Sequence, residues 1–87
     1  MDFFVYLLRC RNNSLYCGYT KDLDNRIEKH NKGTASKYTK RNRPVRLVYF
    51  EKQETISSAL KREIQIKKFS KKEKELLVKT QQLKIID

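Results

Sequence analysis

The sequence has few of the residues that break or brace a chain: no tryptophan, one proline, two glycines, two cysteines and one histidine among 87 residues. Scarce glycine and proline argue against a disordered chain. No apolar run approaches the roughly 20 residues of a membrane span. We do not expect the start, MDFFVYLLRC, to be a signal peptide, because its apolar stretch is short and follows an acid. We therefore expect a single domain over residues 1–87 and no membrane partner.

The two cysteines are too few for a disulfide framework. Cys10 and Cys17 would pair only across a hairpin, and reduced, partly buried thiols are the expectation. Reduced thiols indicate a reducing compartment, hence the cytoplasm. A zinc site would need two more ligands, and His30 is the only histidine, so we expect no zinc.

Acidic residues are also scarce, with 10 Asp and Glu against 21 Lys and Arg, and the net charge is +11. A field of this sign concentrates polyanions, which predicts nucleic acid as the partner. A soluble basic protein of another kind, such as one associated with the ribosome, would carry a similar net charge. The charge therefore predicts a partner and leaves catalysis open.

Hydrophobic patterning and capping residues predict an α+β domain in the order β-β-α-β-α-α, with helices packed on a three-stranded sheet. Strands are expected at residues 3–9, 15–19 and 45–52, the first two joined as a hairpin by the turn residues RNNS at 11–14. The first helix is expected to begin at a cap, Thr20 or Asp22, and to run to about Lys32, where Gly33 ends it. A second helix is expected from about Ile56 to Lys68 after a Thr55 cap. A third is expected from about Lys71 to Lys79 after a Ser70 cap. Residues 34–44 are expected to form a basic loop with at most one helical turn.

A carboxylate interrupts the helix expected after Thr55. Helical spacing places Ile56, Ala59, Leu60 and Ile64 on one apolar face, and Glu63 points into the middle of it. A buried carboxylate is costly unless a cation meets it. Two explanations are open. The carboxylate is structural, either in a salt bridge or at the rim of the core. Alternatively, it is a ligand for a hard divalent ion at the open edge of the core.

Three further features can be explained either as part of the fold or as part of a functional site. Arg26 and His30 lie four residues apart on the first expected helix and border its inner face, either as solvated side chains or as an edge that meets a phosphate. Tyr6 and Tyr16 lie in strands, where a tyrosine is commonly a core residue with a satisfied hydroxyl. Gly18 weakens a strand interior and often permits the close approach of a ligand or of backbone.

These residues together resemble a known family. FVY at 4–6 and YCG at 16–18 resemble the paired signature of the GIY-YIG nuclease superfamily. YTKDLDNRIEKHN is similar to the helix of that family that carries an arginine and a histidine, and ALKREIQIKKFS to its glutamate-bearing helix. The similarity spans roughly residues 3–70, and the chain looks most like the small, stand-alone bacterial members.

The resemblance implies a three-stranded antiparallel sheet flanked by helices and an enzyme that cuts phosphodiester bonds. It implies a catalytic set of Tyr6, Tyr16, Arg26 and His30, with Gly18 and Tyr19 completing the motif and Glu63 as the metal ligand. The implied cofactor is Mg²⁺ or Mn²⁺, bound weakly without substrate because one carboxylate holds it.

Each implied residue has a chemical role. Tyr16 is the candidate base, and Tyr6 orients water or phosphate with its hydroxyl. Arg26 clamps the scissile phosphate with its planar fork. His30 shares a proton with Tyr16 or the phosphate. Glu63 holds the ion against the leaving oxygen.

The chain departs from the family pattern at several positions. Phe4 replaces the first glycine, Cys17 replaces an aliphatic residue, and Tyr19 stands where several members carry a lysine. Many members use an asparagine after the glutamate, but no asparagine follows Asn42 here, which leaves Gln65 or Ser70 as substitutes.

A basic run supplies a track for phosphates that reads no base sequence. It consists of Lys37, Lys40, Arg41, Arg43 and Arg46, with no acid between them, and Tyr38 either stacks on a base or packs. Two functions remain open. The first is a metal-dependent endonuclease acting on DNA rather than RNA, structure-selective or weakly specific, in repair or recombination. The alternative is a non-catalytic nucleic-acid-binding module with a decayed nuclease site.

Overall fold

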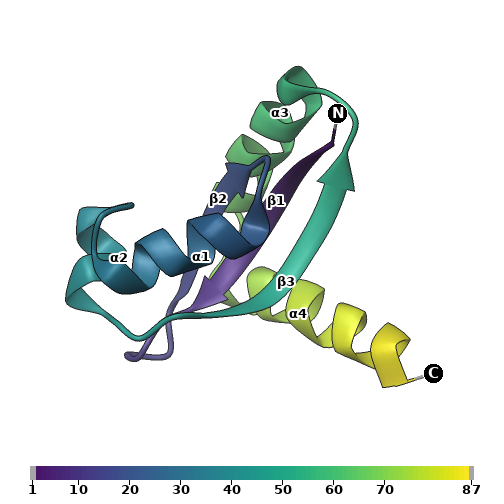
Figure 1. The fold of residues 1–87 in the computed structure, drawn as a ribbon. Coiled ribbons are helices and arrows are strands. Elements are labelled where there is room, and N and C mark those ends of the chain that lie inside the picture. The colour runs from purple at the N-terminus through teal and green to yellow at the C-terminus, as the bar shows by residue number, and fades with distance from the viewer. Residues whose placement is uncertain (1, 87) are drawn as a thin grey trace.

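The computed structural model describes residues 2–86, with side chains through residue 82. Its core is a three-stranded antiparallel sheet in the order β2-β1-β3, formed by β1 (Phe3–Arg9), β2 (Leu15–Thr20) and β3 (Arg46–Gln53). The helices are α1 (Leu23–Lys32), α2 (Lys37–Arg41), α3 (Ile56–Lys67) and α4 (Lys71–Ile86). The predicted fold class is confirmed, with one addition: the basic loop contains the short helix α2 (Figure 1). Among residues 2–86, no helix is both long and apolar enough to span a bilayer.

Strand β1 is the central strand, and helices cover both faces of the sheet. Val5 and Leu7 point toward α3 and α4, while Tyr6 and Leu8 point toward the face that α1 covers. Figure 1 shows α1 crossing one face, with α3 and α4 behind the other. Burial on both faces is consistent with the continuous apolar run FFVYLL of this strand.

Capping residues set most of the helix boundaries as expected. Asp22, rather than Thr20, caps α1 by accepting the backbone N–H of Asn25, and Gly33 ends that helix with φ 83°. Thr20 instead extends β2 by one residue, and its hydroxyl accepts the N–H of Asp22. The helix after Ser70 was predicted too short, because it continues past Lys79 to Ile86.

The predicted apolar face of α3 is wrong in part. Ala59 is buried as expected, but Ile56, Leu60 and Ile64 are 49%, 37% and 54% exposed. Ile66 is fully buried in their place. The helix is therefore turned so that positions 59, 63 and 66, spaced four and three apart, face inward. Glu63 lies between two buried apolar residues, although on a different face from the one predicted.

The pairing of β1 with β3 contains a register shift. Leu7 pairs with Tyr49, but Leu8 pairs with Leu47, so one residue is extra in β3 at this point. As a result Leu47 packs on the α1 face, while Val48 and Tyr49 both pack on the α3 face. Strict alternation would have put Leu47 and Tyr49 on the same face.

The two cysteines are free and buried, as expected. They lie on opposite faces of the sheet, Cys17 in the core under α3 and Cys10 in the core under α1, so their thiols do not meet across the hairpin. Burial, aided by the charge of Glu63, raises the pKa of the Cys17 thiol to about 12. That thiol is therefore protonated and unreactive at neutral pH.

Candidate active site

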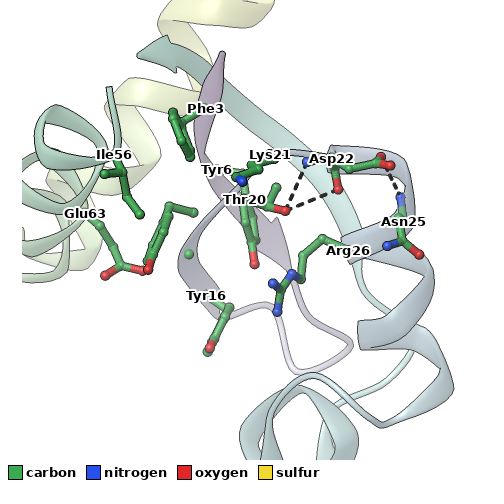
Figure 2. Close-up of a pocket in the computed structure, with 12 residues that line it drawn as sticks. Phe3, Tyr6, Tyr16, Thr20, Lys21, Asp22, Asn25, Arg26, Ile56 and Glu63 are labelled. Carbon is green, nitrogen blue, oxygen red and sulfur yellow. Dashed lines mark hydrogen bonds between the residues drawn. The ribbon is translucent and has the colours of Figure 1, made fainter. Parts of the chain in front are cut away.

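A pocket of about 510 Å³ opens at the β2 edge of the sheet. Four elements contribute predicted site residues to its wall: β1 supplies Tyr6, β2 supplies Tyr16, Gly18 and Tyr19, α1 supplies Arg26, and α3 supplies Glu63. Figure 2 shows Arg26 and Glu63 on opposite sides of this pocket, with Tyr6 and Tyr16 between them. Of the predicted catalytic and metal-binding residues, only His30 is absent from the wall.

The edge position of β2 is what brings Arg26 and Glu63 together. Helices α1 and α3 pack on opposite faces of the sheet, so their inward residues would ordinarily be separated by it. Within residues 2–86, β2 is an edge strand, and Gly18 has no side chain. Side chains from both helices therefore reach the same pocket around this edge (Figure 2).

Gly18 is required by a close approach of Tyr6. The two residues are directly opposite each other on β2 and β1. A Cβ atom on residue 18 would lie 2.4 Å from the Tyr6 hydroxyl oxygen and 2.6 Å from Cζ. Any other residue would therefore displace the phenol from the pocket. The approaching group is a side chain, where the sequence had indicated a ligand or backbone.

His30 was expected either as a solvated side chain or at an edge that meets a phosphate, and the structure places it in neither position. The ring is 1% exposed and lies behind the pocket wall. Its Nε2 is 2.9 Å from the Tyr6 hydroxyl, and its Nδ1 is 2.7 Å from the hydroxyl of Thr39 on α2. The small helix α2, which contacts α1, supplies this hydroxyl and lies against the ring. His30 is therefore not exposed to the pocket.

Burial sets the protonation of this pair. It raises the pKa of the Tyr6 phenol well above its usual range, and the positive charge of Arg26 counteracts part of that rise. Burial, followed by the charge of Arg26, lowers the pKa of His30. At neutral pH the resting pair is therefore a protonated phenol beside a neutral imidazole.

Aromatic contacts connect Tyr16 to the rest of the network. Its ring meets the His30 ring edge-on, with centroids 5.2 Å apart, and stacks on Tyr38 with centroids 6.2 Å apart. The Tyr38 hydroxyl bonds Ser14 in the β1–β2 turn. Of the two predictions for Tyr38, packing is the one that the structure supports, although the ring stays 43% exposed.

The pocket wall carries two cations, Lys21 and Arg26, and two carboxylates, Glu63 and the α1 cap Asp22. Among the ion pairs of residues 2–86, Arg26 has none, so its guanidinium is available to an anion. Glu63 is 13% exposed at its side chain, and its one ionic contact is Lys67 at 3.6 Å, which is 52% exposed. An exposed pair of this length contributes only about 0.3–0.5 kcal/mol, so it does not explain why the carboxylate is inside.

Only some cofactors fit this pocket. The described residues contain no group of three His, Cys, Asp or Glu side chains that would hold a metal by protein ligands alone. A hard ion such as Mg²⁺ keeps most of its waters and binds through one or two carboxylates together with substrate phosphates. Asp22 is engaged in capping α1, so the carboxylate of Glu63 is the one that fits an ion of that kind, held weakly.

The predicted phosphate track is exposed but divided. Lys37, Lys40 and Arg41 lie on α2, and Arg43 reaches back to the carbonyl of Asn31 at 3.4 Å. Arg46 begins β3 and borders a different hollow, which Arg9 and Arg11 also line. Lys40 and Arg43 both lie near Gly33 at the end of α1, and we call Lys37, Lys40, Arg41 and Arg43 the basic surface beside α1, from which Arg46 is separate.

Sequence reasoning missed Thr39 and Asn25. Thr39 is fully buried yet lies in the run interpreted as a loop, so no periodic pattern marked it. Asn25 follows the α1 cap and lines the pocket. The suggested asparagine substitutes do not: Gln65 accepts a hydrogen bond from Arg62, and Ser70 caps α4.

Comparison with known proteins extends this result. The profile of the GIY-YIG catalytic domain matches residues 2–76. The chain is 54% identical over 76 residues to a UPF0213 protein of Staphylococcus aureus strain N315, covering 87% of this chain and 93% of that one. Two solution NMR structures are similar at 40% identity. The UPF0213 protein of Bacillus halodurans has a TM-score of 0.60 over 92% of this chain and 85% of that one. A protein from E. faecalis has a TM-score of 0.64 over 95% of this chain and 88% of that one.

Proposed function

The chain belongs to the GIY-YIG family, a nuclease family, and from this premise we propose that it is a metal-dependent endonuclease that hydrolyses phosphodiester bonds in DNA. The observation that carries the proposal is the pocket at the β2 edge, where a free guanidinium faces a carboxylate across two phenols. An anion clamp, a cation ligand and a hydroxyl between them are the groups that phosphodiester hydrolysis requires. The process served is DNA repair or recombination.

Arg26 binds the scissile phosphate in this proposal. Its planar fork donates two parallel hydrogen bonds to phosphate oxygens and offsets the charge that grows in the transition state. Glu63 would hold the divalent ion on the opposite side of the pocket. When bound, such an ion stabilises the negative charge on phosphorus oxygens and on the leaving oxygen.

Tyr6 is the better candidate for the base, in place of Tyr16. Its hydroxyl has a neutral imidazole 2.9 Å away that can take its proton, whereas Tyr16 meets the same ring only by an aromatic contact. A neighbouring base activates the phenol in the same way as an adjacent histidine activates a serine hydroxyl in other enzymes. Tyr16 then bounds the phosphate site and positions water with its hydroxyl.

A non-catalytic nucleic-acid-binding module is the alternative, favoured by the lack of any asparagine after Asn42. Such a module would bind through the basic surface beside α1 and leave the phosphodiester intact. Supercoiled plasmid and branched DNA incubated with Mg²⁺ or Mn²⁺ separate the two functions, because only an endonuclease nicks them.

The experiment for the metal site is Glu63→Gln, which keeps the shape and removes the charge. We expect Mg²⁺-dependent cleavage to be lost while the unfolding free energy changes by no more than about 0.5 kcal/mol, since only a long, exposed ion pair is removed. Glu28→Gln is the matched control, because it removes an exposed pair with Lys32, and neither residue lines the pocket. Cleavage retained by Glu63→Gln, together with a clear drop in melting temperature, would mean that Glu63 is structural.

A further inference from the structure

A chain of hydrogen bonds continues from the pocket into α2. Beyond His30, the Thr39 hydroxyl lies 2.7 Å from the hydroxyl of Ser36, and the N–H of Thr39 donates to that same serine oxygen at 3.0 Å. Thr39 is fully buried, so water does not compete for its oxygen. The side chain is therefore held by its own helix cap and directed at Nδ1 of the imidazole.

The positive charge of Arg26 determines which group donates in each hydrogen bond of this network. Its cation lies on the pocket side of the Tyr6 hydroxyl (Figure 2). A cation attracts the lone pairs of the phenol oxygen and repels its proton, so the O–H points away from Arg26 and donates to Nε2 of His30. A neutral imidazole that accepts at Nε2 carries its hydrogen on Nδ1.

We propose that Thr39 is a positioning residue whose hydroxyl oxygen accepts the Nδ1–H of His30, which keeps Nε2 free to take the proton of Tyr6. The proposal rests on the proposed nuclease function and adds a third member to the pair Tyr6–His30. Without the hydroxyl, the buried Nδ1–H would have no acceptor, and the ring would favour the tautomer with its hydrogen on Nε2. That tautomer donates to Tyr6 and cannot take its proton.

In the proposed reaction, two protons move in the same step. A water O–H bond breaks and its proton moves to the Tyr6 oxygen, while the Tyr6 O–H bond breaks and its proton moves to Nε2 of His30. The water oxygen forms the bond to phosphorus, and the leaving oxygen departs with its electron pair and takes a proton from solvent. His30 then returns its proton to Tyr6, which releases its other proton to water in the pocket.

The test uses the fact that His30 is the only histidine. Imidazole ¹⁵N NMR of the uniformly labelled protein at neutral pH should show one ring, with the hydrogen on Nδ1. Thr39→Val removes the hydroxyl at similar volume and should move the hydrogen to Nε2. It should also slow single-turnover cleavage by about 100-fold, the lower end of what acid–base catalysis contributes. Thr39→Ser keeps the hydroxyl and should retain both the Nδ1 hydrogen and most of the rate.

Two results would overturn the proposal: a wild-type ring with its hydrogen on Nε2, or a folded Thr39→Val protein with unchanged tautomer and rate. If Thr39→Val does not fold, the wild-type spectrum still decides the position of the hydrogen. If the wild type cleaves no substrate, the proposed function fails, while the NMR result continues to decide whether Thr39 sets the tautomer.

Discussion

The two faces of the sheet are built from different chemistry. Under α3 and α4 the buried residues are apolar, with Leu7 and Ile66 fully buried among their neighbours. Under α1 the buried set includes Tyr6, His30 and Thr39, joined by hydrogen bonds. Among the described residues, no buried side-chain nitrogen or oxygen lacks a partner.

This difference separates stability from site geometry. Apolar packing is non-directional and tolerates small shifts, so it stabilises the fold without specifying one arrangement. A buried polar network is costly unless every partner is in place, so it holds its members in one geometry. Changes on the α3 face should therefore act on unfolding, and changes on the α1 face on the site.

The largest expected effect is on the apolar face. Leu7→Ala should lower the unfolding free energy by about 2–5 kcal/mol, because it leaves a cavity beneath α3 and α4. The molecules that remain folded should bind DNA normally. Urea denaturation measures the loss, and Leu76→Ala, at a leucine 53% exposed, is the control expected within about 0.5 kcal/mol of wild type.

On the opposite face, Arg26→Gln should act on cleavage instead. The rate should fall by about 10²- to 10³-fold, as when one donor to a developing anion is removed. The unfolding free energy should stay within about 0.5 kcal/mol, since no ion pair of the described residues includes Arg26. Lys29→Gln on the same helix removes the same charge outside the pocket. Equal rates for the two variants would contradict the assignment of Arg26.

A smaller effect should distinguish the outer surfaces of the two faces. Lys37→Gln and Lys40→Gln lie on α2 and should each weaken DNA binding and reduce the slope of log affinity against log salt by about 1. Lys72→Gln on α4, behind the other face, should leave the slope unchanged. Fluorescence anisotropy at several salt concentrations measures all three, and an equal change for Lys72→Gln would mean that DNA binding has no preferred side.

The smallest effect is a pH dependence of stability. His30 has a lowered pKa in the folded protein, from burial and from Arg26, so below the unfolded-state value of about 6.5 the unfolded chain binds more protons. Its contribution is fully present above pH 6.5 or so and is lost as pH falls toward the folded-state pKa. Urea denaturation between about pH 5 and 7.5 should show stability rising with pH, and His30→Gln should flatten that rise. A wild-type profile that is flat in this window would mean that the imidazole also protonates when buried.

Periodicity and capping predicted the elements better than the faces they bury. The capping residues Asp22, Thr55 and Ser70 marked helix starts because their side chains bond backbone N–H groups locally. The apolar stripe of α3 was misassigned because three isoleucine and leucine residues at helical spacing are equally consistent with an exposed face. Which stripe turns inward depends on the sheet that the helix covers.

The strand β1, the caps and the motif residues of the family could be predicted from the chain, because each depends on a residue's own chemistry or on neighbours a few positions away. That Arg26 and Glu63 line one pocket around the edge of β2, although their helices cover opposite faces, follows from the tertiary packing alone. The same packing also placed His30 behind the pocket, against Tyr6, 24 residues earlier, and Thr39, nine residues later. Contacts of this kind arise from how whole elements pack, and no local pattern in the chain encodes them.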